Sequence, residues 1–197
     1  MRSIPAASVA ALSLLLATCS SSDSAKGPDR YRVKFETTKG DFVVEVVREW
    51  SPLGADRFHS LITTGFYDGA KFFRVEPGFV VQFGLKGDPA TDAKWENAII
   101  EDDPHAMSNT PATITFATKG PRSRTTQVFI NLADNSRLDA QGFTPFGRVT
   151  DGMQVVANIF PGYRSTPDQM RIQREGNPYL DREFPQMDAI KKASIIP

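Results

Sequence analysis

Apolar and polar side chains alternate along the chain from Tyr31, first over 31–37 and again over 42–47. A short turn sequence that contains Gly40 separates the two runs. A period of two places every second side chain on one face of a strand, and a Gly-containing turn joins antiparallel neighbours. The pattern therefore predicts a β-hairpin at the start of a domain.

Further short apolar runs follow the hairpin, and each is bounded by Gly, Pro, Asn or Asp. Runs of this length between turn residues are typical of buried strands. We expect strands at 71–75, 79–83, 113–117, 127–131, 146–149 and 189–196.

Two segments have helical spacing instead. The first begins at Ser51-Pro52, an N-cap followed by a proline in the first turn, and ends at Gly65. Its apolar side chains fall mostly on one face: Leu53, Phe58, Leu61 and Ile62. The second follows Gly152 and has this apolar series: Met153, Val156, Ile159 and Phe160. Many short strands with two helices predict a mainly β fold, a barrel or sandwich with helical caps.

The organisation of the chain is that of one domain, which we place at residues 30–197. No internal repeat and no interior linker divides this region. The stretch 161–178 has no clear period and is expected to be a long surface excursion.

The first residues have the pattern of an export signal. Arg2 gives a positive start, and an almost uncharged apolar run covers 4–17. This run is too short to span a bilayer comfortably, but it suits the core of a signal peptide. The sequence predicts a signal peptide at 1–19 and a flexible polar tether at 20–29. A buried N-terminal helix is the alternative interpretation.

Cys19 is the only cysteine of the chain, so a disulfide within the chain and a metal site built on several cysteines are excluded. The segment Leu16-Ala17-Thr18-Cys19 resembles a bacterial lipobox, in which the cysteine is lipid-modified after cleavage. Thr18 departs from the Gly, Ala or Ser that is usual before that cysteine. Three outcomes stay open: a membrane-anchored lipoprotein, a soluble secreted or periplasmic protein, and a retained segment.

Charge and composition exclude several classes of function. The chain has 197 residues and a formal net charge of zero, which gives no electrostatic reason to expect nucleic acid or a membrane surface as partner. The two histidines, His59 and His105, have no spacing that suggests metal ligation. Glu101, Asp102 and Asp103 form an acidic run that is interpreted as a solvated loop. No nucleophile elbow, phosphate-binding loop or dinucleotide fingerprint is present.

Three segments remain that carry polar groups among aromatic residues, at 72–84, 116–131 and 138–149. In the first, Arg74 and Gln82 stand among Phe and Val residues. Taken alone, Arg74 is better explained as a surface residue of a strand, whose stem lies along apolar neighbours while its head stays in water.

Taken together and in this order, the three segments resemble the cyclophilin family over nearly all of 31–197. The resemblance implies a closed eight-stranded antiparallel barrel capped by two α-helices, with an active groove on its outer face. It implies a peptidyl-prolyl cis/trans isomerase (EC 5.2.1.8), a rotamase that assists protein folding on Xaa-Pro-containing polypeptides, without cofactor or metal. A closed barrel has no exposed edge, so a monomer is expected.

The resemblance assigns site residues one at a time. The catalytic positions are Arg74, Gln82 and Phe129. The substrate-binding positions are Phe79, Val80, Ala117, Thr118, Gln127, Leu138 and Phe143. Among them, Val80 replaces a more usual Met, Thr118 a common Asn, and Phe143 a frequent His in a loop that is one residue longer. Arg137 stands where cyclosporin-sensitive members have Trp, so weak cyclosporin binding is expected.

Two other functions fit a fold of this class. The same groove could hold proline-containing segments as a non-catalytic chaperone module, but a clamp needs no hydrogen-bond donor at the imide nitrogen, which Arg74 would provide. A carbohydrate- or lipid-binding β domain would require an exposed aromatic platform, and the sequence identifies none.

Overall fold

The computed structural model describes residues 26–197. The expected signal peptide, most of the tether and Cys19 lie outside the described residues. Within the described part, no helix is long and apolar enough to cross a membrane.

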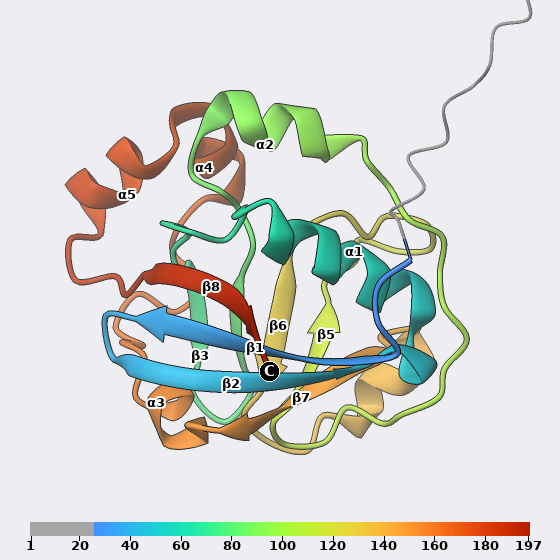
Figure 1. Cartoon of the computed structure of the whole chain (residues 1–197). Helices are drawn as coiled ribbons and strands as arrows, with labels where there is room; N and C mark the ends of the chain where they lie inside the picture. Colours follow the sequence, from blue (N-terminus) through green and yellow to red (C-terminus); the bar gives the residue numbers. More distant parts are fainter. Residues whose placement is uncertain (1–25) are drawn as a thin grey trace, which may run out of the picture.

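Eight antiparallel strands form one strongly curled sheet (Figure 1). Their order across the sheet is β3-β4-β6-β5-β7-β2-β1-β8. The bounds are β1 Arg30–Thr37, β2 Gly40–Val47, β3 Arg74–Glu76, β4 Val80–Phe83, β5 Thr113–Phe116, β6 Val128–Asn131, β7 Pro145–Asp151 and β8 Ile190–Ile196. The mainly β class is confirmed, and each of the strands expected from the sequence is present within a few residues of its expected place.

The two ends of the sheet, β3 and β8, do not pair in a strand-to-strand ladder but are connected by a few contacts near the starts of the two strands. Lys71 forms an isolated antiparallel bridge with Ala189. The backbone N–H of Phe72 donates to Asp188 O at 3.1 Å, and the N–H of Ile190 donates to Ala70 O at 2.9 Å. The sheet is therefore open in its strand order, because β3 and β8 do not pair with each other. Its two edges are linked only by these few hydrogen bonds.

The first helix, α1 (Pro52–Thr63), has the bounds that its sequence signals predict. Gly65, which follows its C-cap, has a φ of +66°, a left-handed conformation that favours glycine. The buried face of α1 includes Phe58 and Leu61, which join the aromatic core inside the curled sheet. There Phe58 lies 4.8 Å from Phe146 between ring centroids.

The expectation of two helices is wrong for residues 26–197, which contain five α-helices and two 3₁₀ helices. The others are α2 (Pro89–Glu96), α3 (Met153–Ala157), α4 (Gln169–Glu175), α5 (Asn177–Glu183), η1 (Arg48–Trp50) and η2 (Ser136–Gln141). The expected second helix is the short α3, and the supposed irregular stretch 161–178 contains α4. In Figure 1, α2, α4 and α5 gather at the upper side of the sheet and α3 lies at the lower side.

Two of the helices that the sequence pattern missed, α2 and α4, begin with a side-chain cap and have no long apolar face. The Asp88 side chain accepts a hydrogen bond from Thr91 N at 2.8 Å at the start of α2. The Asp168 side chain accepts from Met170 N at 2.8 Å at the start of α4. Such N-caps satisfy backbone donors that a helix leaves free, so short helices can form without strong periodicity.

Candidate active site

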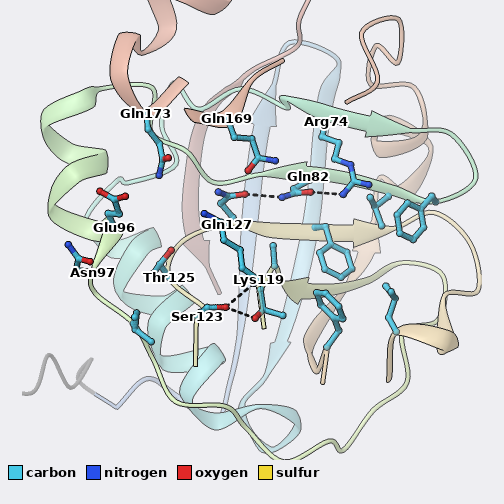
Figure 2. A pocket seen from close by; sticks show the side chains of 18 residues that line it. Arg74, Gln82, Glu96, Asn97, Lys119, Ser123, Thr125, Gln127, Gln169 and Gln173 are labelled. Atoms are coloured by element: carbon cyan, nitrogen blue, oxygen red, sulfur yellow. Dashed lines mark hydrogen bonds between the residues drawn. The ribbon is translucent and has the colours of Figure 1, made fainter. Parts of the chain in front are cut away.

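A groove of about 520 Å³ lies on the outer face of the curled sheet (Figure 2). All ten residues that the sequence assigns to catalysis or substrate binding line it: Arg74, Phe79, Val80, Gln82, Ala117, Thr118, Gln127, Phe129, Leu138 and Phe143. These residues come from segments up to about 70 positions apart in the chain, and the sheet brings them together.

Strand register explains why three of them are neighbours. Arg74 on β3 is directly opposite Gln82 on β4, and Gln82 is directly opposite Phe129 on β6. Directly opposed residues of antiparallel strands project from the same face of the sheet. Their chain neighbours Val81 and Val128 project from the other face and are buried in the main core.

One half of the groove is an apolar hollow. Val80, Phe129 and Leu138 form its base and are 2%, 4% and 8% exposed. Phe79, Ala117 and Phe143 are partly buried against this base. The rings of Phe129 and Phe143 meet edge to face, with centroids 5.7 Å apart. This hollow holds outward-facing apolar groups that the main core does not cover, which is typical of a binding pocket.

A row of polar side chains runs beside the hollow (Figure 2). The Arg74 guanidinium donates from Nη1 to Gln82 Oε1 at 3.1 Å. Gln82 then donates from Nε2 to Gln127 Oε1 at 2.8 Å. Gln82 is only 5% exposed, and these two hydrogen bonds give its buried amide oxygen and amide nitrogen a partner each. The row fixes the guanidinium at the rim of the hollow.

The guanidinium of Arg74 also faces an aromatic ring. Its Cζ atom lies 5.5 Å from the centroid of Phe79. The Cζ atom of Arg137 lies 4.9 Å from the same centroid. Two cations therefore flank one ring at the mouth of the hollow, within the range of cation–π attraction.

Close to Arg74, the Glu76 carboxylate accepts a hydrogen bond from Ser165 Oγ at 2.6 Å. This bond, together with the nearby Arg164 guanidinium, lowers the pKa of Glu76 below its ordinary value. Glu76 is consequently ionised at neutral pH, and a fixed negative charge stands beside the arginine.

Gly84 lets the polar row form. It follows β4 with a φ of +113°, and a Cβ atom at this position would lie 2.5 Å from Thr126 O and 2.7 Å from Gln127 Cα. Only glycine allows the backbone of β4 and the segment that carries Gln127 to approach this closely.

Ala117 and Thr118 form a ledge that continues from β5. The N–H of Ala117 donates to Gln127 O at 2.9 Å. The Thr118 hydroxyl is occupied within its own loop, where it contacts Gly120 O and lies 2.7 Å from Ser123 Oγ. At position 118, the backbone is therefore better placed than the side chain to contact a ligand.

The second half of the groove is polar, and sequence reasoning missed it (Figure 2). Its lining comes from the end of α2, from the loop after β5 and from α4: Glu96, Asn97, Ile99, Lys119, Ser123, Thr125, Gln169 and Gln173. The α2 and α4 contributions could not be placed because neither helix was expected. The Asp-Pro sequence at 88–89 and the Asp168 cap are the signals that could have revealed them.

A charged network holds α4 against α5. Arg171 donates to Glu175 and to Glu183, with distances of 2.8 and 2.9 Å for the closest N–O pairs. Its guanidinium also stacks on Tyr179, 4.0 Å from the ring centroid. A network of this kind restrains a surface helix more than one isolated ion pair does. Gln169 and Gln173, one turn apart on α4, are thereby held over the groove.

No group of three or more His, Cys, Asp or Glu side chains that could hold a metal ion occurs in residues 26–197. His59 packs edge to face against Tyr31, with centroids 5.2 Å apart. His105 lies 3.8 Å from Asp139. Neither histidine lines the groove.

The curled antiparallel sheet, with an arginine beside an outward-facing apolar hollow, agrees with the cyclophilin resemblance of the sequence. Residues 32–176 match the model of the family described as "Cyclophilin type peptidyl-prolyl cis-trans isomerase/CLD". The chain belongs to this family of isomerases, and the resemblance seen in the sequence is confirmed.

Individual relatives agree with this assignment. The chain is 34% identical over 132 residues to a peptidyl-prolyl cis-trans isomerase of Acinetobacter baylyi, an alignment that covers 64% of this chain and 70% of the relative. It is 35% identical over 133 residues to the peptidyl-prolyl cis-trans isomerase-like 1 of Aspergillus fumigatus. This alignment covers 64% of this chain and 80% of the relative.

Solved structures show the same fold. A cyclophilin-type isomerase of Cryptosporidium parvum superposes with a TM-score of 0.63 at 21% identity, covering 85% of this chain and 98% of that one. A second structure of that protein is described as determined in the presence of the dipeptide Ala-Pro. It gives a TM-score of 0.61 at 21% identity and covers 84% of this chain and 99% of that one.

Proposed function

We propose that this protein accelerates cis/trans rotation about Xaa-Pro bonds in polypeptides, with Arg74 and the apolar hollow as its working parts. The observation that carries the proposal is their arrangement. The Arg74 guanidinium is fixed by Gln82 at 3.1 Å, at the rim of the groove whose base is formed by Val80, Phe129 and Leu138.

The barrier to this rotation is electronic. Delocalisation of the nitrogen lone pair into the carbonyl makes rotation about a peptide bond cost ~18–20 kcal/mol. At the transition state, the amide is twisted and the lone pair is localised on a pyramidal nitrogen. A donor aimed at this nitrogen stabilises the twisted state far more than the planar one, and only such differential binding accelerates the step.

Arg74 suits the role of that donor. A guanidinium is permanently charged and donates hydrogen bonds without acting as an acid. A tenfold gain in rate requires about 1.4 kcal/mol of additional transition-state binding, so a several-thousand-fold gain requires roughly 5 kcal/mol. One charge-assisted hydrogen bond, worth about 1.5–3 kcal/mol, and correct orientation together account for a gain of this size.

The hollow holds the proline ring while the acyl side turns. Val80, Phe129 and Leu138 offer apolar contact to a pyrrolidine ring and exclude water from it. Gln127 and the backbone at 117–118 are in position to bind the peptide backbone that leads into the ring. The Ala-Pro dipeptide present with the Cryptosporidium protein supports this choice of ligand. The polar half of the groove would then receive residues that flank the proline.

The reaction forms and breaks no covalent bond, so we propose that it needs no cofactor or metal. The test is a protease-coupled assay on a chromogenic Xaa-Pro peptide, with enzyme dialysed against EDTA. We expect first-order acceleration proportional to the enzyme concentration. Saturable binding of the peptide with no acceleration would instead identify the non-catalytic chaperone module.

Arg137 gives a second expectation at the mouth of the hollow. Its exposed guanidinium covers the Phe79 ring where cyclosporin-sensitive relatives would offer a Trp. Cyclosporin is therefore expected to inhibit weakly, and Arg137→Trp is expected to lower the inhibitory concentration by about tenfold, equivalent to ~1.4 kcal/mol. Inhibition curves in the same assay measure the effect, and equal curves for the two proteins would contradict it.

We infer that the sheet behaves as a closed barrel and the protein as a monomer. The hydrogen bonds between 70–72 and 188–190 support closure, because they cover backbone groups that an open edge would expose. Sedimentation at micromolar concentration tests the monomer.

We also propose export, with 1–19 as signal peptide, 20–29 as tether and 30–197 as the isomerase domain, in the periplasm or on a membrane through a lipid on Cys19. The sequence pattern of 1–19 supports this proposal. Intact mass of the protein from the membrane fraction of its host tests it. A diacylglycerol-sized addition on a chain that begins at Cys19 is expected, whereas a chain that begins at another residue would contradict the lipid anchor on Cys19.

A further inference from the structure

The guanidinium of Arg74 is held along two edges, and only one of them belongs to the row described above. Gln82 accepts from Nη1 at 3.1 Å. On the other edge, Ser165 Oγ accepts from Nε at 3.0 Å. A planar group bonded at two separate nitrogens cannot rotate about its last side-chain bond without breaking one bond. Its orientation toward the hollow is fixed.

Ser165 is itself oriented by a second partner. Its hydroxyl donates to Glu76 Oε1 at 2.6 Å, which turns the oxygen lone pairs toward Arg74. Glu76 stands two residues from Arg74 on β3, so the two side chains leave the same face of the strand. A chain of two hydrogen bonds therefore runs from Glu76 through Ser165 to Arg74.

The loop that carries Ser165 is built into this position by backbone contacts. Arg164 O accepts a hydrogen bond from Val75 N on β3 at 3.3 Å. Arg164 has a φ of +47°, a conformation that is unfavourable for a residue with a side chain. Its guanidinium lies 3.3 Å from Glu76 Oε2. Several contacts thus hold one strained residue, and their combined effect is to place Ser165 beside Arg74.

We propose that Glu76 and Ser165 are positioning residues for the isomerase reaction, which hold the Arg74 guanidinium in the plane that directs its free N–H groups at the proline nitrogen. The inference rests on the proposed function, because it assigns these residues a role through Arg74. Within residues 26–197, the Nη2 group of Arg74 has no hydrogen-bond acceptor, so it stays available to a substrate.

The experiment compares Ser165→Ala with Ser165→Thr, which keeps the hydroxyl. Since orientation matters most in the transition state, we expect Ser165→Ala to lower kcat by roughly tenfold with KM changed less than about twofold. Ser165→Thr is expected to restore kcat. The matched control is Thr166→Ala, an exposed neighbour in the same loop whose hydroxyl forms no hydrogen bond in the described chain, and it is expected to keep wild-type kcat.

Two further measurements separate positioning from a general structural effect. In an Arg74→Ala background, Ser165→Ala is expected to cause no additional loss, because its only route to the reaction is gone. In a ¹⁵N NMR spectrum, the Arg74 Nε–H signal, assigned by its absence in Arg74→Ala, is expected to exchange with water slowly in the wild type and quickly in Ser165→Ala.

The possible failures are distinguishable. Wild-type kcat in Ser165→Ala together with an inactive Arg74→Ala would overturn the positioning role and leave the proposed function intact. An equal loss from Ser165→Ala with and without Arg74 would also overturn it. A fully active Arg74→Ala would overturn both proposals.

Discussion

Replacing Arg74 with Ala is expected to lower kcat/KM by about two to three orders of magnitude, the range measured when one preorganised transition-state donor is removed from an enzyme. The donor proposed for the proline nitrogen is lost, whereas the hollow remains. Because Arg74 is half-buried at the groove rim and belongs to no core cluster, the thermal unfolding midpoint should change little.

Arg74→Lys is the informative companion. Lysine keeps the positive charge but lacks the planar fork that Gln82 and Ser165 hold. We expect it to recover only a small part of the lost activity. Protease-coupled turnover measures both variants, and an Arg74→Ala protein with near-normal turnover would remove this residue from the mechanism.

Replacing Phe129 with Ala is expected to reduce both stability and activity. Phe129 is 4% exposed on β6, and its ring forms the base of the hollow. Truncation of a buried Phe costs about 3–5 kcal/mol, and loss of the hollow's base should raise KM and lower kcat together. Urea unfolding and the protease-coupled assay give the two quantities.

Phe143→Ala is the matched control for Phe129. Its ring touches Phe129 edge to face across the same hollow, but it is only partly buried and belongs to a loop. We expect it to impair activity with a much smaller loss of stability. If Phe129→Ala were as stable as the wild type, the ring would not be packed into the base of the hollow, and its place in the site would need revision.

The positions of the strands follow directly from the sequence, whereas the closeness of the site residues does not. Alternation over 31–47 indicates a hairpin, and the structure pairs Arg30 with Val47 through to Thr37 with Gly40. Nothing in the alternation of one strand fixes its register against another. The side-by-side position of Arg74, Gln82 and Phe129 depends on such registers. It could be expected only from the family resemblance.

The missing helices show a different limit. Helix α2 has only one fully buried residue, the polar Asp92, so it lacks the apolar stripe that periodicity detects. Helix α4 has one buried residue, Ile172. Caps and tertiary contacts stabilise both helices. Consequently the polar half of the groove, including Gln169 and Gln173, and the loop that supplies Ser165 could not be placed from the pattern of the chain.

The order of the strands has a consequence for how the protein matures. Strand β1 lies between β2 and β8, and its pairing extends from Arg32 with Ile196 to Thr37 with Ile190. Until 190–196 leave the ribosome, one side of β1 has unpaired backbone groups. Contacts across so much of the chain form slowly. The sheet is therefore completed late in synthesis. The isomerase fold can form fully only after β8 has been made and has paired with β1.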